Sequence, residues 1–271
     1  MSHSRGGHIV TRLGEGRASW EFGRLVVLLE LSNISKHFGA IQAVNDISLS
    51  LEAGQVVGLM GDNGAGKSTL VKMIAGNFRP SEGTMRLNGS EIVLHRPVEA
   101  RHFGIEIVHQ DLALCDNLTA AANVFLGREL RRGIGPLGVL DYKAMYRRAA
   151  EIFKELRSET RARDLVKQMS GGQRQAVAIA RTMISEAKIV LMDEPTAAIS
   201  VRQVAEVLHL IRQLRDRGIL VVLISHRMPD VFDVADRVVV MRRGRKVADK
   251  PIIETSPEEV TGLITGAIEG G

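Results

Sequence analysis

Two pairs of short, partly alternating apolar segments predict antiparallel hairpins. Residues 26–38 (VVLLELSNISKHF) and 43–54 (AVNDISLSLEAG) are rich in β-branched residues and leucine, which favour extended strands. Residues 83–92 (GTMRLNGSEI) hold Asn88 and Gly89 between two apolar stretches, and an Asn-Gly pair favours a tight hairpin turn. We therefore expect an antiparallel β-subdomain in the early part of the chain.

Continuous apolar runs alternate with helical patterns through the rest of the chain. The continuous runs lie at residues 55–60 (QVVGLM), 187–195 (AKIVLMDEP) and 219–226 (ILVVLISH). Such runs are typical of parallel strands that are buried on both faces. The helical patterns lie at residues 67–77, 171–185 and 201–218, and residues 237–249 predict two further strands with a turn. The alternation of strands and helices predicts an α/β fold with a mostly parallel sheet, covered on both faces.

Residues 111–169 have a different character, because they show helical patterns and no strand signals. The helical stretches lie at residues 117–127, 142–158 and 163–168. They predict an α-helical insert, with a helical subdomain at about residues 111–175. Residues 1–24 are polar, rich in Gly and Arg, and without period, which predicts a disordered N-terminal extension before a domain at 25–271.

Composition narrows the classes of function. Cys115 is the single cysteine of the 271 residues, so no disulfide can form within the chain, which suits a reducing compartment. The net charge is +5, but the small basic clusters at 128–133 and 242–246 contain no interleaved aromatic residues, so we predict no nucleic-acid binding. No apolar run approaches the 18–20 residues of a membrane helix. We expect a soluble protein that can still dock on a membrane protein.

A glycine-rich loop between a predicted strand and a predicted helix carries the first chemical signal. Its sequence, GDNGAGKS, matches the phosphate-binding pattern G-x-x-x-x-G-K-[ST]. Glycines let backbone N–H groups approach phosphate oxygens, Lys67 adds positive charge, and the hydroxyl of Ser68 can ligate Mg²⁺. The predicted nucleotide-binding residues are Gly61, Asn63, Gly64, Ala65, Gly66, Lys67, Ser68 and Thr69. The alternative, a glycine-rich turn with an incidental lysine, fits the flanking strand and helix less well.

Two acids at the end of a predicted buried strand carry the second signal. Asp193 and Glu194 follow the run IVLM, and a parallel sheet presents such residues at its carboxyl edge, beside the loop. Asp193 is expected to hold Mg²⁺ through its water shell, and Glu194 to polarise an attacking water. The alternative is a pair of solvated acids that end a strand. Together the two motifs predict nucleoside-triphosphate binding and hydrolysis, without choosing among kinases, GTPases and motor ATPases.

The segment QMSGGQRQAVAIARTM at 168–183 makes that choice. Ser170, Gly171, Gly172 and Gln173 open a predicted helix, so their N–H groups form a second anion site. Here the chain resembles the ATP-binding cassette (ABC) family over about residues 29–270. The family's usual signature is L-S-G-G-Q, and Met169 replaces its leucine. The resemblance implies a P-loop NTPase fold of RecA-like type that binds ATP and Mg²⁺.

The resemblance also implies roles for residues that carry little signal alone. In that family two cassettes pack head to tail, so Ser170 and Gly172 would contact the γ-phosphate of ATP held by the other cassette. Gln110 resembles the glutamine that senses Mg²⁺, His226 resembles the switch histidine that contacts the γ-phosphate, and Phe38 lies where an aromatic ring stacks on adenine. Taken alone, these three residues could equally be surface, structural or core residues.

The resemblance implies a complete set of reacting groups. The catalytic residues would be Glu194, His226, Lys67 and Gln110, and the metal-binding residues Ser68, Gln110 and Asp193. One departure concerns Ser200, which stands where the family commonly has an aspartate that ties the two cassettes together. This departure puts the strength of coupling between cassettes in doubt.

Three phrases resemble the sugar-import branch of the family, of the ribose, xylose and fructose type. They are VHQDLALCDNLTAAANVFLGREL, EPTAAISVRQVAEVL and ISHRMPDVFDVADRVVVMRRGRKVADK. This resemblance implies a homodimeric ATPase at the cytoplasmic face of the plasma membrane. It would power a permease, and so serve an external sugar-binding protein that takes a monosaccharide. The alternatives are a cassette ATPase of DNA repair or translation, a regulatory module without hydrolysis, and an exporter ATPase.

Overall fold

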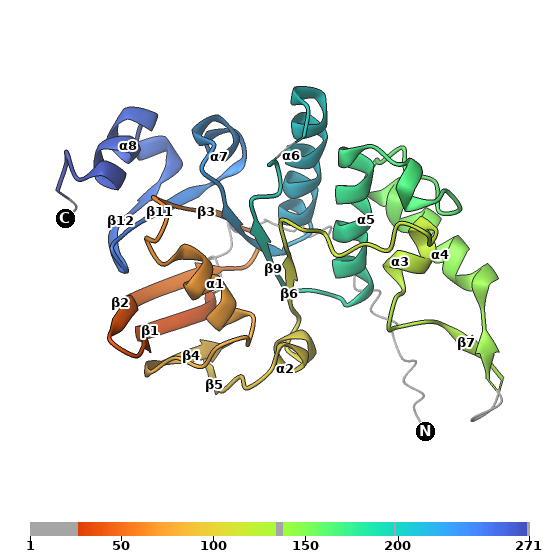
Figure 1. Ribbon diagram of the computed structural model, residues 1–271, viewed down its shortest axis with the longest axis horizontal. Coiled ribbons are helices and arrows are strands. Elements are labelled where there is room, and N and C mark those ends of the chain that lie inside the picture. Colours follow the sequence, from red (N-terminus) through yellow and green to blue (C-terminus); the bar gives the residue numbers. More distant parts are fainter. Residues whose placement is uncertain (1–26, 134–137, 198, 270–271) are drawn as a thin grey trace, which may run out of the picture.

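The computed structural model of this chain describes residues 27–133, 138–197 and 199–269. The extension predicted for residues 1–24 lies outside them. The described chain forms a six-stranded sheet, a four-stranded sheet and a group of helices beside them (Figure 1). The α/β fold expected from the sequence, with a mostly parallel sheet and a separate antiparallel sheet, is confirmed.

The six-stranded sheet has the strand order β12-β11-β3-β10-β9-β6. Its strands are β3 (Val56–Gly61), β6 (Ile105–Val108), β9 (Ile189–Asp193), β10 (Leu220–Ile224), β11 (Arg237–Arg242) and β12 (Arg245–Pro251). All neighbouring pairs are parallel except β11 and β12, which form an antiparallel hairpin. The central strands are buried along almost their whole length, which explains their continuous apolar sequence.

Apolar side chains on the two faces of this sheet pack into two separate hydrophobic cores. On one face, residues such as Val57 and Leu59 pack with α1 (Lys67–Ile74) and the antiparallel sheet. On the other face, residues such as Val56 and Met60 share a core with helices. Those helices are α3 (Ala120–Val124), α4 (Tyr142–Glu155), α5 (Gly171–Ile184), α6 (Val201–Asp216), α7 (Met228–Val234) and α8 (Pro257–Thr265).

The antiparallel sheet contains both predicted hairpins in the order β2-β1-β4-β5. Its strands are β1 (Val27–Phe38), β2 (Ile41–Glu52), β4 (Glu82–Leu87) and β5 (Ser90–Ile92). Asn88 and Gly89 form the turn between β4 and β5 with φ angles of 50° and 76°. Positive φ at both central residues is what a two-residue hairpin requires, so the Asn-Gly prediction is confirmed.

The helical insert differs from the sequence expectation in two details. Two short strands, β7 (Arg131–Arg132) and β8 (Val139–Leu140), pair within the stretch predicted to lack strands. Strands of two residues are too short to show alternation, so the pattern could not reveal them. The stretch at 163–168 forms only a 3₁₀ turn, Val166–Gln168, because Met169 and Ser170 return to extended backbone before α5 begins at Gly171. The predicted boundaries of the helical subdomain, about 111–175, stay a prediction.

Several elements were not predicted individually, namely α2 (Pro97–His102), β6, α7 and α8. Each is nine residues or shorter, and β6 carries a half-buried glutamate that interrupts its apolar pattern. Among the helices in the described part of the chain, none combines the length and the apolar character that crossing a bilayer demands.

Candidate nucleotide-binding site

The glycine-rich loop connects β3 to α1, as the sequence predicted. Gly61, Gly64 and Gly66 have φ angles of 150°, 78° and 100°, in the region that side chains disfavour. Gly66 is the residue before the helix, so the N–H groups of the first turn of α1 point back into the loop. The loop therefore has the backbone conformation of an anion-binding nest at a helix N-terminus.

Segments from both ends of the chain form the walls of this loop. A Cβ atom at Gly61 would clash with the carbonyl oxygen of Met241, and one at Gly66 would clash with the carbonyl oxygen of Ala43. The N–H of Gly244 donates to the carbonyl of Ala65 over 3.0 Å. The hairpins β1–β2 and β11–β12 thus hold the loop between them, and the sequence motif alone gave no sign of these walls.

Lys67 is the first residue of α1, directly after the loop, and is 9% exposed. Its ammonium group donates to the carbonyls of Gly61 and Asp62 over 2.8 and 3.0 Å. Burial lowers the pKa of Lys67, while the carboxylates of Glu194, Asp62 and Asp193 oppose that effect. Asp193 and Glu194, the acids predicted at the strand end, are therefore close enough to Lys67 to act on its charge, as expected if the three residues belong to one site.

Asp193 ends β9 in a half-buried position beside Glu194. Burial raises the pKa of Asp193, and the neighbouring charge of Glu194 raises it further, whereas His109, Lys72 and Lys67 work to lower it. Such competition between burial, a second carboxylate and several cations is common at functional sites. A bound cation would favour the ionised form of this carboxylate.

Glu194 is held in an unusual backbone conformation and faces His226. Its φ angle is 51°, and its N–H donates to the carbonyl of Ile224 at the end of β10 over 2.9 Å. Its carboxylate oxygen Oε2 lies 2.8 Å from Nδ1 of His226, yet Oε2 has no hydrogen-bond donor, because the contact lacks hydrogen-bond geometry. The Glu194 side chain is 16% exposed and that of His226 is 68% exposed. The structure therefore brings these two predicted residues together at the mouth of the site.

Gln110 follows β6, the neighbour of β9 in the sheet. Val108 pairs with Met192 in the parallel ladder, so Gln110 and Asp193 follow neighbouring strands at one edge of the sheet. Gln110 is exposed, and Ser68 and Thr69 are half-buried in the first turn of α1. These positions agree with a shared site without by themselves assigning a ligand.

Phe38 ends β1 at the tip of the hairpin that supplies one wall of the loop. Its ring is 41% exposed and meets Phe78 edge-on, with 5.2 Å between the ring centroids. The ammonium of Lys36 lies 5.3 Å from the Phe38 centroid. Phe38 thus belongs to an exposed aromatic and cationic cluster, of which the sequence indicated only one member.

The predicted second anion site is the start of α5. The hydroxyl of Ser170 accepts from the N–H of Gln173 over 3.2 Å, and the Gln173 side chain accepts from the N–H of Ser170 over 3.0 Å. This reciprocal capping box fixes the first turn of the helix. Met169 packs against the core, so an apolar residue is kept at that position.

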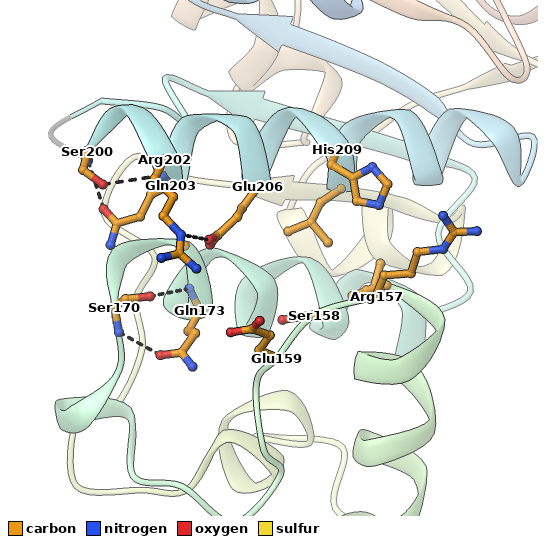
Figure 2. Close-up of a pocket in the computed structure, with 13 residues that line it drawn as sticks. Arg157, Ser158, Glu159, Ser170, Gln173, Ser200, Arg202, Gln203, Glu206 and His209 are labelled. Carbon is orange, nitrogen blue, oxygen red and sulfur yellow. Dashed lines mark hydrogen bonds and ion pairs between the residues drawn. The ribbon is translucent and has the colours of Figure 1, made fainter.

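The signature glycines also let α5 pack closely on α6 (Figure 2). A Cβ atom on Gly171 would lie 2.7 Å from Cγ2 of Ile199, and one on Gly172 would clash with the carboxylate of Glu206. These glycines therefore serve helix packing as well as any ligand. A cavity of about 440 Å³ opens beside this contact and is lined by Ser170, Gln173, Arg202, Glu206 and His209 among others. None of the residues of the glycine-rich loop lines it.

Ser200, which departs from the family pattern, caps α6 in the same way. Its hydroxyl accepts from the N–H of Gln203, and the Gln203 side chain accepts from the N–H of Ser200 over 2.9 Å. The spacing Ser-x-x-Gln, present at both helix starts, is a sequence signal for this capping box. Ser200 thus caps α6 as an aspartate at this position could, but it carries no negative charge.

Known proteins are similar to this chain in sequence and in fold. The profile of the ABC transporter family matches residues 44–197. The chain is 42% identical over 241 residues to a xylose/arabinose import ATP-binding protein of Sulfolobus acidocaldarius, which covers 88% of this chain and 94% of that protein. It is 38% identical to a ribose import ATP-binding protein of Geobacillus kaustophilus over 88% of this chain, and spans 48% of that longer protein.

Solved structures show the same likeness. A nucleotide-free ATP-binding cassette of an ABC transporter matches with a TM-score of 0.75 and 27% identity, covering 86% of this chain and 97% of that one. A dimeric post-hydrolysis state of an ATP-binding cassette with ADP and phosphate matches with a TM-score of 0.66 and 26% identity, covering 83% of this chain and 99% of that one.

Proposed function

Because this chain belongs to the ABC transporter family of ATP-hydrolysing subunits, we propose that it powers a membrane importer for a monosaccharide. The observation that carries the proposal is its 42% identity, over nearly the full length of both chains, to a xylose/arabinose import ATP-binding protein. The proposal is supported by the charge interactions that link Lys67 with Asp193 and Glu194, and by the contact of Glu194 with His226. The alternative of DNA repair or translation finds no support in these relatives.

In the proposed reaction the loop binds the phosphates of ATP and Lys67 neutralises their charge. The buried ammonium exchanges the carbonyls of Gly61 and Asp62 for phosphate oxygens, which are stronger acceptors. Ser68 and Asp193 offer the oxygen donors that suit Mg²⁺, together with Gln110 from the neighbouring strand. Among the described residues, no three or more His, Cys, Asp or Glu side chains are grouped so that they could hold a metal ion by themselves. When bound, Mg²⁺ supplies charge stabilisation to the transferring phosphate.

Glu194 is the proposed base that orients the attacking water. Its Oε2 makes no hydrogen bond within the described residues, but it is buried at its 2.8 Å contact with His226, so the attacking water would reach it only when His226 turns away. The left-handed backbone at Glu194, fixed through the carbonyl of Ile224, directs this carboxylate toward His226. In this proposal His226, whose side chain is mostly exposed, would turn to contact the γ-phosphate.

The proposed active assembly is a head-to-tail homodimer. The loop and the start of α5 are two anion-seeking helix starts, and they line different regions of one chain. In the dimer, Ser170 and the N–H groups of Gly171, Gly172 and Gln173 would complete the site of the partner. A cassette of similar fold is known as a dimer with ADP and phosphate, which supports this arrangement. Phe38 would stack on the adenine at the open side.

The permease is proposed to dock in a cavity of about 260 Å³ next to Gln110. Its lining includes His109 and Leu112 from the segment after β6, Leu126 from the helical insert, and Arg181 from α5. The cavity lies between the segment that contains Gln110 and the helical insert. A permease bound in it could therefore affect the ATP site through Gln110. The chain would then lie at the cytoplasmic face of the membrane and act indirectly with an external sugar-binding protein.

The test uses tagged Glu194→Gln protein, purified from detergent-solubilised cells with ATP and Mg²⁺ and examined by mass spectrometry. We expect turnover to fall by about two orders of magnitude or more, binding of ATP to persist, and a multi-spanning permease to copurify. Glu91→Gln, an exposed change on β5, is the matched control. Unchanged ATP turnover in Glu194→Gln would contradict the catalytic assignment, and ribosomal or nucleic-acid partners without a permease would contradict the importer.

A further inference from the structure

A basic groove lies on the helical insert, away from the nucleotide-binding site. It runs between α4 and the segment 157–164 and has a volume of about 920 Å³. Six cationic side chains line it, namely Lys143, Arg147, Lys154, Arg157, Arg161 and Arg163, and Asp164 is the one carboxylate in the lining. Figure 1 places α4 at the end of the molecule opposite to α8. We call this feature the basic groove.

The spacing of these cations is built into the fold. Lys143, Arg147 and Lys154 are four and seven residues apart on α4, so they form one stripe along the helix. The stripe covers about 16 Å, at a rise of 1.5 Å per residue. A single phosphate or carboxylate cannot reach along it, but an extended chain of anions can.

The opposite bank of the basic groove is fixed in place. The carbonyls of Ala162 and Asp164 accept from the N–H groups of Ala121 and Ala120 in α3, over 3.0 and 2.9 Å. Arg163 stacks on the ring of Tyr146, with 5.0 Å from its guanidinium carbon to the ring centroid. The segment is thus anchored to α3, and one cation is already positioned over an aromatic face.

The cationic side chains of the basic groove lack ion-pair partners in the described part of the chain, in contrast to Arg148 on α4. None of the six cations belongs to an ion pair among the described residues, whereas Arg148 on another side of α4 pairs with Glu151 and Glu155. Like charges four residues apart on a helix oppose its stability, and a concave surface of one sign concentrates counter-charges. This pattern indicates a surface completed by an anionic partner.

We propose that the basic groove docks an acidic polypeptide segment of a partner protein. A concave groove suits a chain that enters it better than a flat bilayer, and the ring of Tyr146 is covered by Arg163 and so gives no stacking platform for a nucleic-acid base. Carboxylates along an extended segment match cations spread along the helix, and arginines bind carboxylates through paired N–H groups. This surface is separate from the cavity proposed for the permease, with which it shares no lining residue.

The test measures binding of a fluorescein-labelled glutamate-rich peptide of twelve residues to the full chain by fluorescence polarisation. The variant Arg147→Glu/Lys154→Glu should weaken binding by about tenfold or more, because two attractive charge pairs become repulsive. The matched control Arg86→Glu/Lys188→Glu changes the net charge equally at exposed cations outside the basic groove, and should leave binding within about twofold. The milder Arg147→Gln/Lys154→Gln, with unchanged circular dichroism, should give an intermediate loss.

Three results would overturn the proposal. The first is equal loss in the groove variant and the control, which would indicate general charge attraction alone. The second is no measurable binding of the peptide to the unaltered chain. The third is stronger, groove-dependent binding to phosphatidylglycerol vesicles, or to an oligothymidine of equal charge, than to the peptide. In that case a membrane or a nucleic acid would be the partner.

Discussion

Substitution of Gly66 by alanine tests whether the walls of the loop, and not only its backbone angles, define the site. At Gly66 the φ angle is 100°, and an added Cβ would lie closer than 3.0 Å to the carbonyl oxygen of Ala43. At Gly64 the φ angle is 78° and no heavy atom lies within 4 Å of an added Cβ. The pair therefore separates strain in the backbone from collision with the hairpin β1–β2.

The magnitudes follow from these two environments. Left-handed backbone costs an alanine about 1–2 kcal/mol, of which the lower entropy of the unfolded chain returns a part, so Gly64→Ala should lose about 1 kcal/mol. Gly66→Ala bears the same cost and must also move a backbone carbonyl, so we expect a loss of about 3 kcal/mol. For a chain of this size that difference corresponds to roughly 4–8 °C in Tm.

Thermal unfolding followed by circular dichroism, with and without ATP and Mg²⁺, measures both effects. The stabilisation by ATP should persist in part in Gly64→Ala and disappear in Gly66→Ala, because the shifted loop can no longer point its N–H groups at phosphate. Equal Tm values for the two variants would refute the role of Ala43 as a wall. Undiminished ATP stabilisation of Gly66→Ala would refute it as well.

Three further outcomes follow from contacts at and around the site. Lys67→Ala should weaken ATP binding by about 10- to 100-fold in a calorimetric titration, since a charge-assisted hydrogen bond is lost, and unchanged affinity would contradict the assigned role. Ser200→Ala should lower stability by about 1 kcal/mol in urea unfolding through loss of the cap to Gln203, whereas Ser200→Asp should retain it; equal losses would argue against capping. Burial works to raise the pKa of Asp249, but the hydrogen bond and charge of Arg237 prevail and lower it. Its stabilising effect is present above the unfolded pKa near 3.9 and is lost as pH falls through the lower folded value, so Asp249→Asn should flatten the acid limb of a stability-against-pH curve.

The candidate reacting groups could be proposed from the sequence because each sits in a short, contiguous motif. The loop around Lys67 and the pair Asp193–Glu194 follow buried strands, and parallel strands present such residues at one edge. The meeting of Glu194 with His226 follows from the pairing of β9 with β10, but the backbone strain at Glu194 has no sequence signal, because the residue is not glycine.

The parts that escaped prediction depend on contacts between distant segments or on very short elements. Ala43 and Met241 are far from the loop in sequence, and their carbonyls carry no residue-specific pattern. The packing role of Gly172, where an added Cβ would clash with Glu206, could not be inferred from the signature, because the family resemblance assigns this glycine to ligand binding. Ser200 departs from the aspartate that is common in the family, yet its Ser-x-x-Gln spacing from Gln203 indicates a helix cap from the sequence alone.

The two hairpins that hold the loop have a consequence for how the protein reaches its active form. The motif itself is complete by Ser68, but Gly244, whose N–H donates to Ala65, is synthesised about 180 residues later. A growing chain on the ribosome therefore carries every phosphate-binding residue of the motif long before it has the wall that shapes them. We expect affinity for ATP to appear only when the last strands of the sheet are in place, so nucleotide binding would report completed folding.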